Sequence, residues 1–77
     1  MAHVYVYELP EGQAVIRSVA EHSWQVAYEG NPFAGRYPSP QAALNAVHSG
    51  EAKWTGLPGT SPAARLPALL GEWSPPP

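Results

Sequence analysis

The sequence contains no cysteine and no aspartate, and only 13% of its 77 residues are charged, against about 25% in an average protein. Without cysteine the chain forms no disulfide and offers no thiolate to a metal. Four lysines and arginines against six acidic residues give a net charge of −2. This balance argues against a nucleic-acid-binding protein, because such proteins neutralise phosphates with a basic face.

Long hydrophobic runs are also missing, since no segment approaches the ~18 apolar residues that a membrane-spanning helix needs. Residues 1–12 lack the basic start and the apolar core of a signal peptide. We therefore expect a cytoplasmic protein that does not contact a membrane. Ten prolines, seven glycines and many alanines suggest a bacterial or phage genome of high GC content.

The apolar content of the chain is nevertheless high. Hydrophobic residues make up 44% of the sequence and include three tryptophans, too much for a disordered chain. A chain of this length fits one domain, with a small margin of stability. We expect a single domain over residues 1–73 and a proline-rich tail over residues 74–77.

Three segments have the pattern of β-strands. Residues 2–9 alternate between a valine side and a tyrosine side, and both residue types are strand formers. Residues 14–20 and 24–28 are the second and third segments, and short turns connect all three. Residues 33–37 form either a short fourth strand or an irregular return.

The clearest helix signal covers residues 41–48. Ser39 is a natural N-cap, Pro40 suits the first helical position, and Gly50 suits the residue after the last turn. The apolar stripe of this helix consists of Ala43, Leu44, Ala46 and Val47. Because helices this short are marginal alone, we expect it to pack on the sheet.

The last third begins with a loop, residues 54–60. We expect the side chains of Trp54 and Leu57 to anchor this loop. An apolar stripe at helical spacing follows, formed by Leu66, Leu69, Leu70 and Trp73. Pro67 removes a backbone donor within it, so we predict two short helical turns rather than one helix. The stripe either covers the protein's own core, which we favour, or docks into a partner or a second copy.

Strands followed by a helix predict an α+β fold. We expect an antiparallel sheet of three or four strands, packed against one helix, with a short C-terminal helical segment. The alternation leaves open which sheet face is core. We favour a core made of the helix stripe and five strand residues, Val4, Val6, Trp24, Val26 and Tyr28. Tyr5, Tyr7 and Arg17 would then lie on an open face.

No pattern of catalytic or metal-binding residues is present. The three histidines, His3, His22 and His48, lie in different segments and lack the spacing of metal ligands. No serine has a base and an orienting group at recognisable spacing, and the glycines do not form a phosphate-binding loop. We therefore predict that the protein is not an enzyme and binds no metal or cofactor.

Aromatic and arginine side chains on an open surface are typical of protein-binding sites. We predict a protein partner that binds the aromatic sheet face or the C-terminal stripe. The candidate residues are Tyr5, Tyr7, Arg17, Arg36, Leu69 and Trp73. The tyrosines also suit ordinary cross-strand pairing. Two alternatives stay open: single-stranded nucleic acid stacking on this face, and a homo-oligomer formed through the stripe.

Residues 24–47 resemble the plant ethylene-response-factor domain and the N-terminal sheet domains of phage integrases. The matching positions are Trp24, Val26, Gly30, Gly35, Tyr37, Ser39, Ala42, Ala43 and Ala46. The resemblance implies a three-stranded sheet on one helix and, in those families, a sheet that carries arginine and tryptophan into the DNA major groove. The corresponding outward positions here are Gln25, Ala27 and Glu29, with only Arg17 and Arg36 basic nearby.

A second segment, residues 50–62, is similar to part of the MbtH-like activators of peptide synthetases. Those proteins also place strands, a helix and then a Trp-Thr segment ending in proline. Trp54, Thr55 and Pro58 match that segment here, whereas the family's Ser-Leu-Trp-Pro segment is missing. This resemblance implies an activator that binds a larger enzyme.

Overall fold

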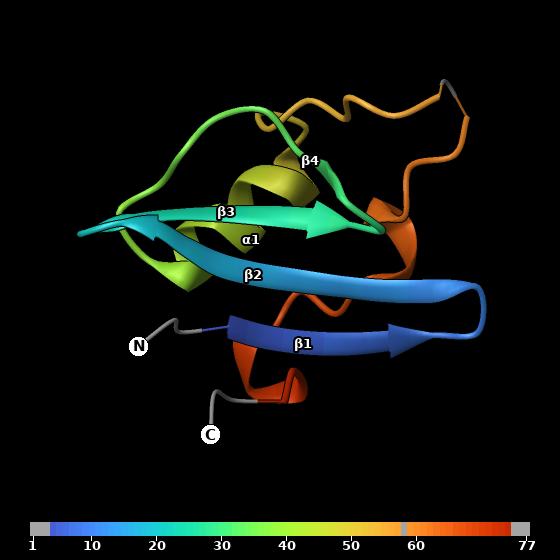
Figure 1. The fold of residues 1–77 in the computed structure, drawn as a ribbon, viewed down its shortest axis with the longest axis horizontal. Helices are drawn as coiled ribbons and strands as arrows, with labels where there is room; N and C mark the ends of the chain where they lie inside the picture. Colours follow the sequence, from blue (N-terminus) through green and yellow to red (C-terminus); the bar gives the residue numbers. More distant parts are fainter. Residues whose placement is uncertain (1–3, 58, 75–77) are drawn as a thin grey trace.

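The computed structural model describes residues 4–57 and 59–74, so His3, Pro58 and residues 75–77 of the predicted tail lie outside the described residues. The elements in chain order are β1 (Val4–Leu9), β2 (Gly12–Ala20), β3 (Ser23–Tyr28), β4 (Asn31–Pro32), α1 (Pro40–Ser49) and two 3₁₀ turns, η1 (Ala63–Arg65) and η2 (Leu70–Glu72). The strands form one antiparallel sheet in the order β1-β2-β3-β4 (Figure 1). The predicted α+β fold is confirmed.

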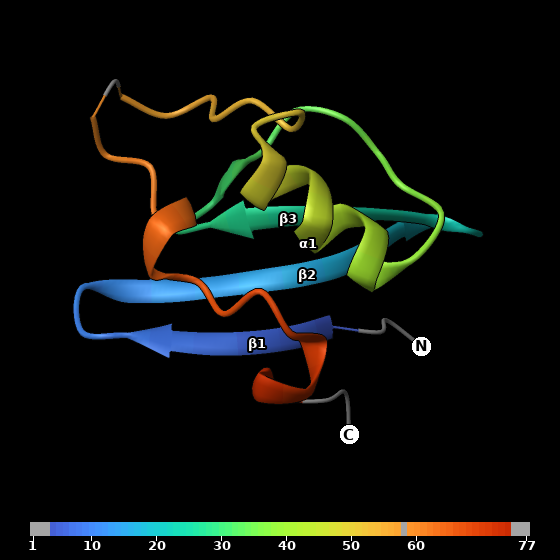
Figure 2. The same cartoon turned by 180° about the vertical axis from the view of Figure 1, so that it is seen from behind.

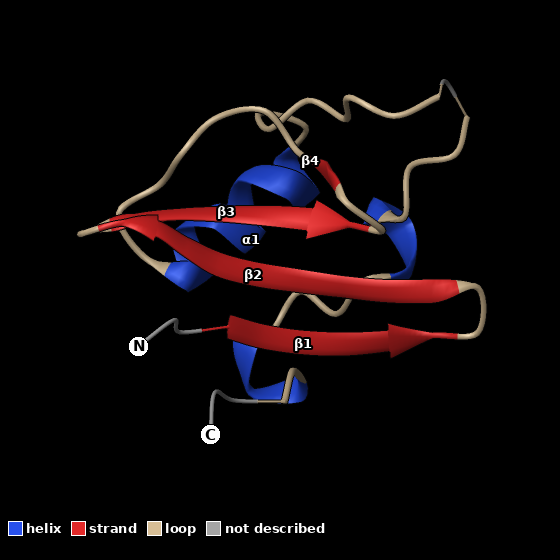
Figure 3. Cartoon of the chain, viewed as in Figure 1, coloured by secondary structure: helices blue, strands red, loops and turns tan. Residues whose placement is uncertain are grey.

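Residues 33–37 form the irregular return, one of the two predicted alternatives, and a two-residue fourth strand precedes them. β4 contains two residues, and residues 33–39 then return irregularly along β3. Phe33 and Tyr37 in this return make isolated bridges, Tyr37 with Trp24 of β3 and Phe33 with Trp54. Figure 3 shows how much of the chain beyond β3 is loop.

The helix forms as its capping residues predict. Ser39 has an extended backbone, and its hydroxyl accepts a hydrogen bond from the Ala42 N–H at 3.1 Å. Pro40 occupies the start of the helix, where no intrahelical N–H is needed. Gly50 follows in the left-handed region, with φ of 85°, and its N–H bonds to the Val47 carbonyl.

All covering elements lie on one side of the sheet. Figure 2 shows α1 across β2 and β3 and the C-terminal segment, residues 61–74, across β1 and β2, both on the same side. The buried residues between these two layers are Ala14, Ile16, Val26, Tyr28, Phe33, Ala43, Leu44, Ala46, Val47, Ala52, Leu66 and Trp73. The predicted apolar stripe of the helix is thus wholly in the core.

The predicted orientation of β1 is wrong. Residues directly opposite each other in an antiparallel sheet point to the same face. Tyr5 lies opposite Ile16 and Tyr7 lies opposite Ala14, and both β2 partners are fully buried. The two tyrosines therefore face the core, half-buried, while Val4 and the other valine of β1 point away from it. The predicted orientation of β3, with Val26 and Tyr28 buried, is confirmed.

The physical reason is the turn between β1 and β2. Both sides of β1 are apolar, so its alternation does not distinguish core from surface. The turn contains only Pro10 and Glu11, and it pairs Leu9 with Gly12. That register decides every later pair of the hairpin, including the tyrosines with the buried side of β2.

The C-terminal segment belongs to the core, as favoured. Trp73 is 3% exposed, its ring centroid lies 5.6 Å from that of Tyr7, and its Nε1–H donates to the Pro67 carbonyl at 3.2 Å. Ser74 then pairs with Val6 through two backbone hydrogen bonds of 2.8 and 3.0 Å. Residues 70–74 thereby cover part of the outer edge of β1.

The two short helical turns are confirmed, but the stripe is not continuous. Pro67 interrupts it, so η1 and η2 are separated by extended backbone. Leu66 is consequently buried while Leu69 is 65% exposed. In the preceding loop Trp54 packs against Phe33, with ring centroids 4.9 Å apart. The expected side-chain anchor at Leu57 is wrong: that side chain is 75% exposed, and only its carbonyl takes part, accepting from the Trp54 indole.

Trp73→Ala should lower the free energy of unfolding by about 3–5 kcal/mol, because it empties a buried site and removes the ring that covers Tyr7. Leu69→Ala is the matched control from the same stripe, and its exposed side chain should cost less than about 0.5 kcal/mol. Urea unfolding followed by circular dichroism measures both. Equal costs for the two variants would contradict a C-terminal segment that forms part of the core.

Candidate functional site

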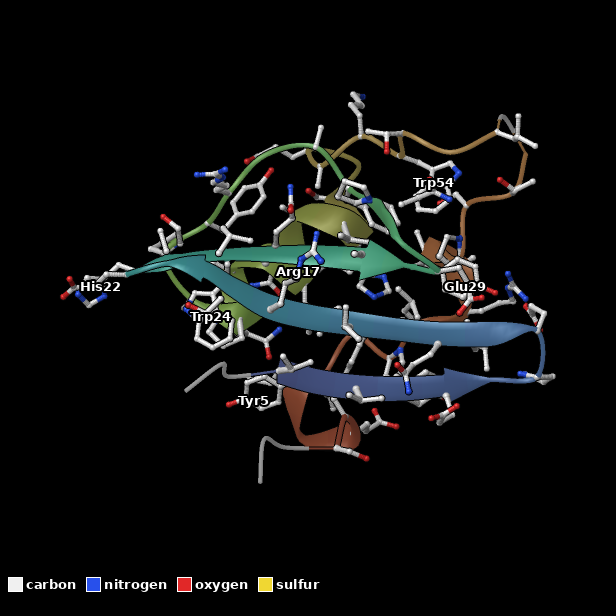
Figure 4. The ribbon with its side chains drawn as sticks, viewed as in Figure 1. Tyr5, Arg17, His22, Trp24, Glu29 and Trp54 are labelled. Atoms are coloured by element: carbon white, nitrogen blue, oxygen red, sulfur yellow. The ribbon has the colours of Figure 1, made fainter. Side chains whose placement is uncertain are left out.

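One face of the sheet has no described element over it. Figure 1 is viewed from this side, with α1 behind the strands. The strand register assigns eight residues to this surface, here named the uncovered face: Val4, Val6, Glu8, Gln13, Val15, Arg17, Gln25 and Ala27. Figure 4 shows the Arg17 side chain in front of the strands on this side.

An apolar row crosses the middle of the uncovered face. Val6, Val15 and Ala27 lie opposite one another on β1, β2 and β3, and Pro32 of β4 continues the row. Ala27 is 1% exposed, while the two valines are half-buried. Valine methyl groups therefore form the centre of this surface.

A positively charged end flanks this row. Arg17 lies opposite Val4 on one side and Gln25 on the other. The Gln25 side chain is held in place, because its Nε2–H donates to the Phe33 carbonyl at 3.1 Å. Arg17 is exposed, and among the described residues no carboxylate lies within ion-pair distance of its guanidinium.

A negatively charged end lies on the other side of the apolar row. Glu8 of β1 is paired with Gln13 of β2. The Gln13 Nε2–H donates to Glu8 Oε1 at 2.8 Å, which draws the carboxylate towards β2. The uncovered face therefore has an apolar centre, one cationic end and one anionic end.

The structure separates the predicted binding residues. Arg17 lies on the uncovered face, whereas Tyr5, Tyr7 and Trp73 face the opposite layer as part of the core or packed against it. The aromatic sheet face predicted as a binding surface is therefore an inner surface. Its tyrosines pack on other rings: Tyr5 lies 6.1 Å from Trp24 between ring centroids.

The two remaining candidates, Arg36 and Leu69, are exposed but lie in other parts of the fold. Arg36 belongs to the return after β4, and Leu69 precedes η2. The sequence interpretation missed Val4, Val6 and Val15 as surface residues. The two-residue turn carried the signal that identifies them, because it places Arg17 and Val4 on the same face.

Tyr37 is the one residue of the β4–α1 return with a perturbed pKa. Partial burial and, to a smaller extent, the neighbouring Glu51 carboxylate raise the pKa of its hydroxyl above the usual 10.0. The ring lies over Gly35, where φ is 98° and an added Cβ would come within 2.9 Å of the Tyr37 hydroxyl. Glycine at this position lets the tyrosine lie flat against the return.

Residues 4–57 and 59–74 contain no cluster of three metal-ligating side chains and no detectable pocket. Of the histidines described, His22 lies on an exposed turn with its Nε2 3.4 Å from the adjacent Glu21 carboxylate, and His48 is exposed on α1.

Comparison of the chain with models of known families, with curated proteins and with solved structures found no match. Within the described part of the chain, no helix has the length and apolarity needed to cross a membrane.

Ionisation of Tyr37 should be displaced to alkaline pH. Because its pKa is raised in the folded protein, its contribution to stability is complete below pH 10.0 and is lost as pH rises through the folded-state pKa. The tyrosinate absorbance of the folded chain is measured against pH, and that of the Tyr37→Phe variant is subtracted. The difference should have its midpoint at a pH above 10.0. In Glu51→Gln that midpoint should fall part of the way, since burial, the larger cause, is unchanged. A midpoint at or below 10.0 in the unmodified chain would contradict this environment.

Proposed function

We propose that this chain is a non-enzymatic protein-binding module that uses the uncovered face. The observation that supports this most directly is the composition of that face. An antiparallel sheet that faces water on one side normally alternates apolar residues inward with polar residues outward. Here Val4, Val6 and Val15 point outward and are half-buried, whereas Ala27 beside them is 1% exposed.

The energetics favour a protein ligand for such a surface. Covering apolar area yields roughly 25 cal/mol per Å², and an apolar centre with a polar rim is the usual anatomy of protein interfaces. Arg17 is a residue type enriched among the energetically dominant positions of interfaces. It is exposed and lies beside the valine row, where it can reach a partner's carboxylate.

Nucleic acid is less well suited to this face. Arg17 is its only cation, and Glu8 lies on the same surface, so the local charge does not favour phosphate. The aromatic rings that would stack on bases face the core instead. An activator of a larger enzyme, as the MbtH-like resemblance implies, would be one case of this proposal, since such an activator works by binding a protein.

The absence of cysteine allows a direct test. Val15→Cys introduces a single thiol at the centre of the uncovered face, and a photo-reactive label attached to it should cross-link to a bound protein in a cell extract. His48→Cys, on the exposed side of α1, is the matched control and should transfer little or no label. Mass spectrometry identifies the cross-linked product.

Two outcomes would contradict the proposal. Equal labelling from the two positions would mean that the uncovered face has no preference for protein. Retardation of duplex or single-stranded DNA by the unlabelled chain, with an affinity that falls steeply with salt, would favour the nucleic-acid alternative instead.

A further inference from the structure

We propose that the partner of the uncovered face is a second copy of this chain, which packs on it face to face around a two-fold axis. This rests on the proposed function, that the uncovered face binds protein. The strand register and the placement of two charges carry the inference.

The anionic and cationic ends lie on opposite sides of Val15, at equal distances along the strands. On β2, Gln13 and Arg17 each lie two residues from Val15 and point to the same face. Gln13 holds the Glu8 carboxylate through its 2.8 Å hydrogen bond. The two charges therefore lie on opposite sides of the valine row but on neighbouring strands, Glu8 on β1 and Arg17 on β2.

A two-fold axis along the Val6–Val15–Ala27 row exchanges these two ends. Rotation about this axis places the apolar row of one copy on the apolar row of the other. It also places Arg17 of each copy over Gln13 and the neighbouring Glu8 carboxylate of the other copy. A two-fold interface requires this self-complementarity, because the same patch is used twice. Sheets packed in this way lie about 10 Å apart, which suits valine in the centre and a long arginine at the ends.

Packing through the face is favoured over addition of a strand at an edge. At the β1 edge, the backbone N–H and C=O of Val6 are hydrogen-bonded to the backbone of Ser74. At the β3 edge, Tyr37 is bonded to Trp24, and β4 follows along the strand. Both edges are thus partly closed, whereas Val6 and Val15 between the charged ends are half-buried with no described element over them.

The area of the face predicts a weak dimer. Three strands, two of them six residues long, form a surface of about 14 by 20 Å at ordinary strand spacing. That is less than the ~800 Å² per partner of a standard interface, so association should depend on concentration. Electrostatic repulsion between two copies should oppose association only weakly, since each chain has a net charge of −2.

Sedimentation velocity from about 10 µM to about 1 mM, the range suited to a contact of this size, tests the pairing. The average mass should rise from that of one chain towards that of two. Glu29 also lies at the anionic end, where its carboxylate accepts from the Gln13 backbone N–H at 2.9 Å. Arg17→Glu makes both ends acidic, and Glu8→Lys combined with Glu29→Gln makes both ends basic, so each variant alone should associate at least about tenfold more weakly. An equimolar mixture of the two should associate again, because every contact then joins an acidic end to a basic end.

Lys53→Glu and Glu72→Lys reverse single charges in the same two directions at exposed positions away from this face, and both should associate like the unmodified chain. Thermal unfolding confirms that each variant is folded. A single-chain mass at every concentration overturns the inference, as does a mixture that associates no better than its components. In either case the photo-reactive label at Val15→Cys distinguishes the two proposals. If the label cross-links to a different protein, the uncovered face still binds protein and only the second copy is excluded as its partner. If the label cross-links to no protein, both proposals are contradicted.

Discussion

The fold depends on covering the tyrosine side of β1. α1 has only ten residues and spans β2 and β3, so it leaves Tyr5 and Tyr7 beyond its reach. The C-terminal segment supplies the missing cover through Trp73. It is tied to the helix by the Gln41 side chain, which donates to the Ala68 carbonyl and accepts from the Leu70 N–H, both at 3.1 Å. Without that segment the sheet would expose aromatic rings along one whole edge.

Covering one face in this way determines the character of the other. The helix and the C-terminal segment both lie on the inner side of the sheet, while the return lies along the β3 edge. The outer side of the described structure is therefore composed of strand residues alone, and β1 and β2 contribute valines to it. An apolar surface in water favours any partner that excludes the solvent, and the charges of Glu8 and Arg17 limit which partner fits.

Much of the local structure could be predicted from the sequence, whereas the site could not. Strand positions, the Ser39 cap, Gly50 and the break at Pro67 all act within a few residues, so a short stretch of sequence specifies them. Of the predicted binding residues, Arg17 alone lies on the uncovered face. The predicted face of Tyr5 and Tyr7 was wrong because valine and tyrosine are both apolar and both strand formers. Their alternation along β1 therefore does not show which side faces the core.

The sequence by itself determined the elements, their order and the α+β class, since periodicity and capping are local properties. The tertiary structure decided which side of each element is inside. Leu69 and Leu66 belong to one stripe in the sequence, yet one is exposed and the other is buried, because the chain turns at Pro67. Trp73 and Tyr7 are far apart in sequence and meet only when the C-terminal segment crosses β1. Contacts of that kind arise from the path of the whole chain, and they left the valines of β1 and β2 on the surface.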